Sequence, residues 1–521
     1  DQGEEVEGAQ VSSVVCGCCE TLEDNSHIMS YGACDQLVIG ELKAICEEVY
    51  DQGEEVEERS IDRSGWGPFM PECVVCPKTV AEVQAVMRLC FAKKIPVVPR
   101  GAGTGLEGAA LPVRGGVVLD VMQLRQMELK KDDLVLVCGP GWFKVEVNNM
   151  LEKHGLLFGP DPSSNPSVGG MAATSGSGLS TLKYGTSREN LVSLQMVLPN
   201  GDLMETKRLV RKSSAGYDLT QLFAGSEGTL GVITQLAWRV HALPKLRVGS
   251  LISFKDVGAA ARCVVAFRHS VVPSLARCEM LNGPGMQATN KKFKMQLEEV
   301  PTLFLEFQGD NIDQLMEDAR NTEQMAKKHG CTGYVLAEEG SKIDDLWEAR
   351  RGCFFAAKDW NDRPEADNVY PGDCCVPLSS LPDVISQTEA VFNGCGLPPI
   401  MCCHIADGNF HLLVPYNESE RATMMACDKK AVELALAAGG TCTGEHGVGL
   451  GKMKYMKAEH GDVHVQVMRN IKKAIDPLHI MNPGKIFTMT DEEAVPSMST
   501  GEVSAVVDGP SVAAAATSAK L

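Results

Sequence analysis

The chain has 521 residues, of which 44% are hydrophobic and 22% are charged, and its formal net charge is −19. This length allows two or three domains with a large core, and no apolar run of about eighteen residues indicates a membrane span. The negative net charge argues against binding to nucleic acid and gives no sign of attraction to anionic lipid. For the same reason, an anionic substrate would need a local cationic pocket.

The two ends of the chain differ in composition from the rest. Residues 1–57 are acidic and Cys-rich, and Asp1–Glu7 recurs as Asp51–Glu57. This composition predicts a poorly ordered extension and does not match an Arg/Ser-rich, acid-poor transit peptide. Residues 491–521 are predicted to form a flexible tail. The tail ends in Ala519-Lys520-Leu521, which is close to the S-K-L peroxisomal signal. A peroxisomal location is therefore an alternative.

Between these ends, strands and helices alternate. Thr79 and Glu82 form a predicted capping box, followed by apolar residues at helical spacing. The other predicted elements before residue 243 are strands at Ile95–Val98, Gly116–Val121 and Leu134–Cys138, a helix at Phe143–His154, and a hairpin of Leu191–Leu198 with Leu203–Lys207. After Leu243 the pattern changes to strand–helix pairs such as Thr302–Phe307 followed by Ile312–His329, which predicts a domain boundary there.

The 20 cysteines are scattered, which favours buried thiols in a reducing compartment over a disulfide framework. Cys73-Val-Val-Cys76 has no second pair placed to complete a zinc site, and no iron–sulfur type cysteine run occurs. We therefore expect no second redox centre of the chain's own.

Three glycine-rich loops follow strands in the first half of the chain, at Arg100–Gly108, Gly159–Gly185 and Gly225–Gly231. Glycine lets backbone N–H groups approach an anion closely because no Cβ intervenes. Each loop alone could be a set of tight turns, but three in one domain favour a long dinucleotide. The first loop has the G-x-G-x-x-G spacing at Gly103–Gly108, but we assign no acidic partner to it, which argues against a nicotinamide site.

The segment from His404 to His411 predicts a metal site. A two-residue turn at Asp407-Gly408 would place His404 directly across from His411, with Cβ atoms roughly 5 Å apart. Glu445, flanked by Gly444 and Gly447, could supply a third ligand. Two histidines and a carboxylate with an open position form a catalytic zinc arrangement, although paired histidines on a hairpin are more often structural.

Further candidate site residues are a histidine that could act as a base and two arginines that could bind a substrate carboxylate. His446 follows Glu445, and a neutral imidazole can take a proton from a substrate hydroxyl. Arg350 and Arg351 could each grip a carboxylate with two parallel hydrogen bonds. We interpret Arg351 as part of a solvated helix face.

The glycine loops resemble the FAD-binding domain of the vanillyl-alcohol-oxidase (PCMH-type) flavoproteins. Within that superfamily the chain is similar to the cytochrome-linked D-lactate dehydrogenase family over about residues 60 to 490. The blocks that carry this similarity are Gly103–Gly108, Arg211–Thr220, Thr441–Gly449 and Met481–Lys485.

The resemblance implies an α+β fold. A PCMH-type FAD-binding domain would cover residues 58–243, and a ferredoxin-like α+β substrate (cap) domain residues 244–490. Residues 452–490 would return to the FAD domain, and flexible extensions would lie at 1–57 and 491–521.

The resemblance also implies the chemistry. FAD would be bound non-covalently, because the first loop has no histidine to attach it, and D-lactate would be oxidised to pyruvate by hydride transfer to flavin N5. Electrons would pass to a separate carrier such as cytochrome c or an electron-transfer flavoprotein, in the mitochondrion. A divalent metal, for which the ligands suit zinc, would bind His404, His411 and Glu445, with His446 as base and Arg350 on the substrate carboxylate. The residues expected to contact FAD are Arg100, Gly101, Gly103, Thr104, Gly105, Leu106, Pro160, Asp161, Gly169, Gly170, Thr174, Gly178, Tyr184, Gly185, Glu227, Gly228, Gly231, Ile233 and Asn482.

Alternatives remain within and outside this family. The D-2-hydroxyglutarate branch has an Asn where this chain has Leu413. It also has a Lys before the Asp-x-x-x-Pro stretch, where this chain reads Tyr370-Pro-Gly-Asp373-Cys-Cys-Val-Pro377, so polar contacts for a second carboxylate are missing. Glycolate differs from lactate by one methyl group, which a hydrophobic pocket discriminates weakly. A non-catalytic flavin-binding subunit and a colourless zinc protein are the alternatives from other classes.

Overall fold

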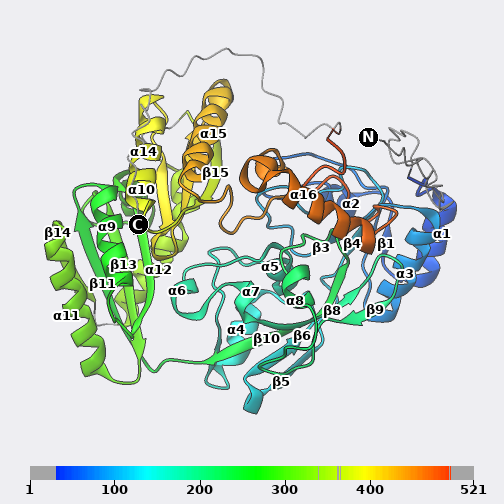
Figure 1. Ribbon diagram of the computed structural model, residues 1–521, viewed down its shortest axis with the longest axis horizontal. Helices are drawn as coiled ribbons and strands as arrows, with labels where there is room; N and C mark the ends of the chain where they lie inside the picture. The colour runs from blue at the N-terminus through cyan, green and yellow to red at the C-terminus, as the bar shows by residue number, and fades with distance from the viewer. Residues whose placement is uncertain (1–30, 338–339, 361–362, 364, 492, 494–521) are drawn as a thin grey trace, which may run out of the picture.

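The computed structural model describes residues 31–337, 340–360, 363, 365–491 and 493, which form three sheets (Figure 1). Residues 1–30 and the predicted tail from 494 onward, including Ala519-Lys520-Leu521, lie outside the described residues. None of the described helices is both long and apolar enough to cross a membrane.

The first sheet has the order β1-β2-β4-β3, with β2, β4 and β3 parallel. The capping box of Thr79 and Glu82 is confirmed at the start of the long helix α3, which buries Val83, Val86 and Met87. The elements of this part are α1 Gln36–Ile45, β1 Val49–Tyr50, α2 Glu54–Arg59, β2 Cys73–Val75, α3 Val80–Lys93, β3 Val97–Arg100 and β4 Val117–Asp120.

The prediction of a poorly ordered extension over residues 1–57 is wrong for residues 31–57. Helix α1 buries Val38, Ile39 and Leu42 in the core of the first sheet, and β1 pairs with β2. The acidic residues between 31 and 57 are exposed or half-exposed. In the repeated stretch, Glu54 and Glu55 occupy the first turn of α2, where carboxylates stabilise a helix N-terminus.

The second sheet is antiparallel, with the order β5-β6-β10-β8-β9 and β7 paired with β10. The predicted hairpin is confirmed, because β8 and β9 pair Val197 with Leu203. The elements are β5 Met127–Lys130, β6 Val135–Cys138, α4 Lys144–Glu152, β7 Leu156–Phe158, α5 Val168–Thr174, α6 Thr181–Tyr184, α7 Ser187–Asn190, β8 Leu191–Val197, β9 Leu203–Glu205, α8 Leu219–Phe223 and β10 Val232–Ala242.

The third sheet begins at Leu246 and has seven antiparallel strands in the order β14-β11-β13-β12-β16-β17-β15. Its first four strands in chain order lie as 4-1-3-2, which is the ferredoxin-like arrangement, and three more strands extend the sheet. The strands are β11 Leu246–Phe254, β12 Leu275–Leu281, β13 Thr302–Gly309, β14 Cys331–Ala337, β15 Asn368–Cys375, β16 Ile400–His404 and β17 Asn409–Tyr416.

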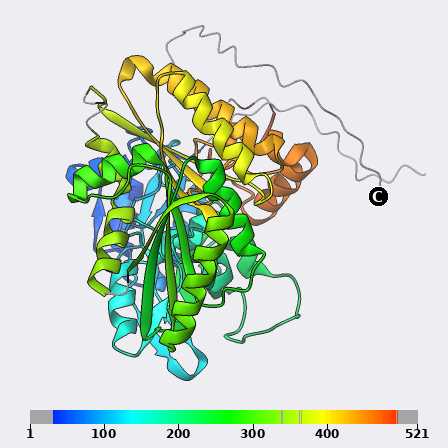
Figure 2. The same ribbon diagram turned by 90° about the vertical axis from the view of Figure 1, so that its left-hand side faces the viewer.

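The helices of this domain lie on both faces of the third sheet (Figure 2). One face carries α9 Val257–Arg268, α11 Ile312–Lys328, α14 Leu381–Gly394 and α15 Arg421–Ala437. The other face carries α10 Gly283–Phe293, α12 Gly340–Arg351 and α13 Cys353–Lys358. This second layer covers only part of the face and leaves the rest to loops from the first two sheets.

The end of the described chain packs on the first domain. Helix α16 Met456–Ile475 is kinked at Gly461 and lies beside the first domain in Figure 1. Its Ile471 and Ile475 pack against the core of the second sheet. Beyond it, Met481 pairs in parallel with Val97 of β3.

Candidate active site

Side-chain alternation gathers the charged residues of the third sheet on one face. Because successive side chains of a strand point to opposite faces, Glu279 of β12, His404 of β16, His411 of β17 and Asp373 of β15 lie on the face away from α9 and α14. These strands are consecutive neighbours in the sheet. Four chain segments thus contribute to one cluster.

The register of the hairpin differs from the prediction. His404 pairs with Asn409, and His411 pairs with Cys402, so the expectation that the two histidines lie directly opposite each other is wrong. The connection is a 3-10 turn at Ile405–Asp407 closed by Gly408 at φ +80°, which is longer than a two-residue turn. His404 and His411 are instead diagonal neighbours on one face, with ring centroids 5.2 Å apart.

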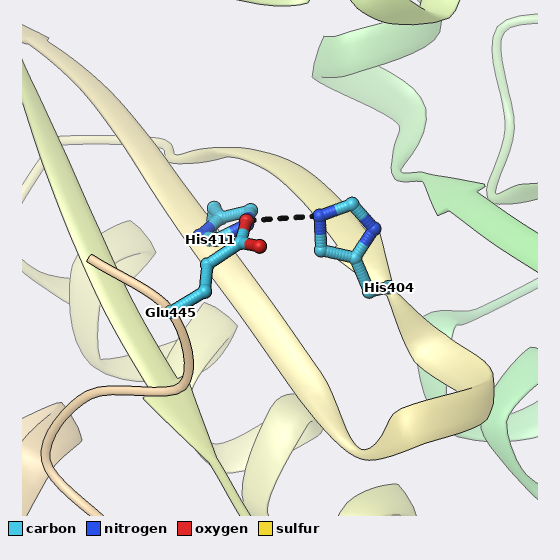
Figure 3. Close-up of side chains that lie close together, drawn as sticks. All are labelled: His404, His411 and Glu445. Carbon is cyan, nitrogen blue, oxygen red and sulfur yellow. Dashed lines mark hydrogen bonds and ion pairs between the residues drawn. The ribbon is translucent and has the colours of Figure 1, made fainter. Parts of the chain in front are cut away.

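The structure nevertheless brings His404, His411 and Glu445 together (Figure 3). Oε1 of Glu445 lies 3.0 Å from Nε2 of each histidine, and one ligand atom from each residue lies within 4.8 Å of the others. Nδ1 of His404 lies 2.9 Å from Oε1 of Glu279, and Nδ1 of His411 lies 3.4 Å from Oδ1 of Asp373. Carboxylates behind the rings therefore turn both Nε2 atoms toward one point.

The charges of this cluster suit a divalent cation. The buried carboxylates of Glu279, Asp373 and Glu445 and the guanidinium of Arg350 leave a net charge of −2. Burial lowers the pKa of both imidazoles, but these carboxylates outweigh it, raising the pKa of His411 to about 9 and that of His404 well above its ordinary value. Two protons or one divalent cation would neutralise the site, and the donor set of two imidazoles and one carboxylate fits the cation.

His446 lies beside this cluster on a loop that Asp373 holds. Oδ2 of Asp373 accepts hydrogen bonds from the backbone N–H groups of Gly444, Glu445 and His446, at 2.7 to 3.1 Å. The ring of His446 stacks on that of His411, with centroids 4.8 Å apart and planes 2° apart. Burial lowers the pKa of His446 to about 4, so the imidazole is neutral near neutral pH and able to accept a proton.

Arg350 is 1% exposed and faces the same cluster. It donates hydrogen bonds to Oε2 of Glu279 at 2.5 Å and to Sγ of Cys402 at 2.6 Å. Its Nε is buried and has no hydrogen-bond acceptor among the described residues. A buried donor without a partner is costly, and a ligand oxygen would relieve that cost.

The interpretation of Arg351 as a solvated side chain is wrong. Its side chain is 35% exposed and pairs with Oδ2 of Asp161 at 2.8 Å. Asp161 also pairs with Arg277 and with Lys144, each at 3.0 Å. Asp161, which was expected to contact FAD, is thus engaged by cations from both domains and holds them together.

The predicted glycine loops meet each other and reach the histidine cluster. The N–H of Ala102 donates to Oγ of Ser167, which joins the first loop to the second, and the N–H of Glu227 donates to the carbonyl of Ala173, which joins the second to the third. Ser177, within the second loop, donates to Oε2 of Glu445 at 2.5 Å. The second loop therefore contacts the cluster directly.

The first loop has free backbone donors that fit a dinucleotide. No hydrogen bond between described residues uses the N–H groups of Gly103, Thr104, Gly105 and Leu106, and these residues are partly exposed. Consecutive backbone N–H groups of this kind form a cradle for an anion such as a pyrophosphate. The residues present thus fit FAD.

Several of the expected FAD residues also hold the loops in place. Arg100 donates to the carbonyl of Ile61, Tyr184 to Oε1 of Gln308, and Asn482 to the carbonyls of Ala109 and Glu227. The side chain of Glu227 accepts hydrogen bonds from the loop after His446. Of the other expected residues, Gly101, Pro160, Gly178, Gly185, Gly228 and Gly231 lie in loop backbone, whereas Gly169, Gly170 and Thr174 lie in α5 and Ile233 lies in β10.

Sequence reasoning missed Glu279 and Ser177 and noticed Asp373 only as part of a stretch that separates branches of the family. Glu279 lies 125 residues from His404 and Ser177 lies 268 residues from Glu445, so no local spacing connects them. A buried acid in the middle of an apolar strand, as at Glu279, was the one signal that could have marked it.

Comparison with known proteins identifies the family. The FAD binding domain model matches residues 71–207, and the model of the FAD linked oxidases, C-terminal domain, matches residues 243–486. The D-lactate dehydrogenase [cytochrome], mitochondrial, of Arabidopsis thaliana is 39% identical over 421 residues, covering 80% of this chain and 73% of the relative. The corresponding enzyme of Kluyveromyces lactis is 38% identical over 80% of this chain and 74% of its own length.

The chain belongs to this family of FAD-linked oxidoreductases. The solved structure of p-cresol methylhydroxylase with substrate bound shares the fold, with a TM-score of 0.73 at 16% identity over 86% of this chain and 96% of that one. The predictions of a PCMH-type fold, of FAD binding and of an oxidoreductase are confirmed.

Proposed function

We propose that this protein oxidises a small D-2-hydroxy acid, with D-lactate preferred, to the 2-oxo acid. The observation that carries the proposal is the neutral His446 stacked beside the cluster of His404, His411 and Glu445. Ser177 of the second glycine loop contacts Glu445, so the base, the cation ligands and the loops expected to bind flavin lie together.

Two bound groups would complete the site. FAD, held by the three glycine loops, would accept a hydride at N5 and pass the electrons to a separate carrier such as cytochrome c. A divalent cation, with zinc the best fit to the ligands His404, His411 and Glu445, would act as a Lewis acid that lowers the pKa of the substrate hydroxyl.

Arg350 supplies the anion site that a protein of charge −19 needs. Its guanidinium is buried, and Nε has no acceptor among the described residues, so a substrate carboxylate would fill a vacant bonding position. Burial excludes water from this contact, which strengthens it. We therefore assign the carboxylate of the acid to Arg350.

His446 is suited to take the hydroxyl proton. No hydrogen bond between described residues engages its ring, and Nδ1 is fully buried, so Nε2 is the nitrogen left to face a substrate. A base with a pKa below the working pH is unprotonated and ready at the start of each turnover. Stacking on His411 keeps the ring oriented.

The wall beside His411 is apolar. Leu413 points to the same face two residues further along β17, and Cys402 lies opposite His411 on β16. This surface suits the methyl group of lactate and offers no partner to a second carboxylate. It favours D-lactate over D-2-hydroxyglutarate.

The test is a substrate panel on the FAD-loaded protein under anaerobic conditions. D-lactate should bleach the flavin absorbance and give the highest kcat/KM, followed by glycolate and then D-2-hydroxyglutarate, with L-lactate as the stereochemical control. An unbleached flavin with D-lactate, or a higher kcat/KM for the dicarboxylate, would refute the proposal.

We also propose a mitochondrial location, which the names of both relatives support. A fluorescent fusion at the N-terminus and one at the C-terminus, expressed in the same cells, separate the mitochondrial from the peroxisomal address. Peroxisomal signal that depends on the last three residues would contradict the proposal.

A further inference from the structure

Glu279 lies in the middle of the substrate domain's sheet, and its carboxylate contacts both His404 and Arg350. It is 2% exposed. Its Oε1 lies 2.9 Å from Nδ1 of His404, and its Oε2 accepts a hydrogen bond from Arg350 at 2.5 Å. We propose that Glu279 is a positioning residue that couples metal binding at His404 to binding of the substrate carboxylate at Arg350. This inference rests on the proposed function.

The fold places Glu279 between the two groups. Strand β12 pairs Met280 with Cys403 of β16, and this register brings Glu279 level with His404. Arg350 comes from the last turn of α12 and also reaches Cys402 of β16. A strand, its neighbour and the covering helix therefore converge on one carboxylate.

The contact with His404 governs the metal site. When Nε2 is the metal-binding nitrogen, Nδ1 carries the hydrogen and donates it to Glu279. Such a carboxylate fixes the ring and its tautomer and raises the basicity of the ligand, and its loss costs about tenfold to a hundredfold in metal affinity. The contact of His411 with Asp373 is longer, at 3.4 Å, so Glu279 is the stronger holder of the pair.

The contact with Arg350 governs the anion site. Glu279 keeps the guanidinium oriented and compensates its charge where water is excluded. A metal on Nε2 would withdraw electron density from the ring, so Nδ1–H would bond more strongly to Glu279 and leave less negative charge for Arg350. The guanidinium then attracts a substrate carboxylate more strongly. By linkage, the carboxylate must favour the metal to the same extent.

The first measurement is zinc affinity of the FAD-loaded, full-length protein in competition with a chromogenic chelator. Glu279→Gln, which keeps the volume and removes the charge, should weaken zinc binding about tenfold to a hundredfold. The matched control is Glu306→Gln, since Glu306 is equally buried and pairs with Arg277 at 3.4 Å but contacts no metal ligand. Its zinc affinity should equal that of the wild type.

The direction in which a second variant changes zinc affinity distinguishes coupling between the two sites from a purely structural role of Glu279. Arg350→Met removes a positive charge from beside Glu279 and should tighten zinc binding several-fold. A residue that only supports the fold would weaken zinc binding in both variants. The proposal is overturned by an unchanged zinc affinity in Glu279→Gln, or by both variants changing in the same direction.

Turnover gives a separate readout. At saturating zinc, Glu279→Gln should raise the KM for D-lactate about tenfold and leave kcat within about threefold, since it weakens binding rather than proton transfer. Should this variant lose FAD, Glu279→Asp takes its place, because its shorter chain keeps the charge but cannot reach both partners. Zinc affinity needs no turnover, so inactivity of the wild type toward D-lactate would refute the proposed function and leave the zinc result to decide this inference.

Discussion

The two halves of the site are built in different ways. In the first domain, the groups proposed to bind FAD are backbone groups of glycine loops, and each loop is one continuous stretch of sequence. In the second domain, the side chains of four strands and one loop meet on a sheet face, from Glu279 to Glu445. The first half depends on local conformation, and the second on register between distant segments. Substitutions in the first half should therefore lower the FAD content of the protein. Substitutions in the second half should slow flavin reduction or weaken binding of the metal or substrate.

The largest effect is expected from His446→Ala. The protein should retain its FAD, because no loop contact is lost, and flavin reduction by D-lactate should slow by at least about a hundredfold. Stopped-flow anaerobic reduction measures the rate, and His464→Ala, an exposed histidine on α16, is the control. An unchanged rate of flavin reduction would show that His446 takes no part in the reaction. It would also contradict the expectation that side chains of the second domain carry the chemistry.

The pH dependence of zinc affinity tests the sheet-face half alone. The pKa of His411 is raised to about 9 and that of His404 is raised as well, so both rings hold protons below that pH in the metal-free protein. Zinc must displace these protons, and its affinity should rise by up to about a hundredfold per pH unit between pH 6 and 8. Chelator competition at several pH values measures this slope, while FAD affinity should stay nearly constant. A flat profile would show that the two rings do not bind the ion.

Gly178→Ala tests the loop half. At φ +147°, an added Cβ would meet the carbonyl oxygen of Asp161 at 2.1 Å, so the backbone itself must move. We expect a loss of roughly 2–4 kcal/mol in unfolding free energy and lower FAD content after purification. Gly394→Ala at the end of α14 is the matched control, because no atom lies within 4 Å of its added Cβ. Equal thermal unfolding of the two variants would count against a strained loop.

The smallest effect concerns Glu107, a buried acid at the end of the first loop. Burial raises its pKa to about 8, so between pH 4.5 and 8 the folded protein holds a proton that the unfolded chain has lost. The stability contributed by this group is present at low pH and is lost as pH rises through that window. Glu107→Gln should remove a few degrees of the fall in Tm between pH 5 and 8, whereas the exposed Glu128→Gln should not. A parallel fall in both variants would assign the pH dependence elsewhere.

The contrast between local conformation and register between distant segments also explains which features the sequence could predict. The capping box at Thr79 and the hairpin at Val197 and Leu203 depend on neighbours in the chain and were predicted. The metal ligands were predicted as residues, but their register was wrong, because the turn type depends on packing around Ile405–Asp407. The contacts of Glu279 could not be predicted, since its partners lie in another strand and in helix α12. Residues 31–57 were misjudged because acidic composition hid three apolar residues on one side of α1.

The pairing of Met481 with Val97 has a consequence for the order of assembly. Asn482 donates hydrogen bonds to the carbonyls of Ala109 and Glu227, and Lys485 donates one to that of Leu111, so this segment holds loops made 255 to 374 residues earlier. A ribosome releases a chain from its N-terminus onward, and the early part can fold before the rest exists. Here the nucleotide-binding loops lack these contacts until residues 481–485 have emerged, so we expect stable binding of flavin to wait for that segment.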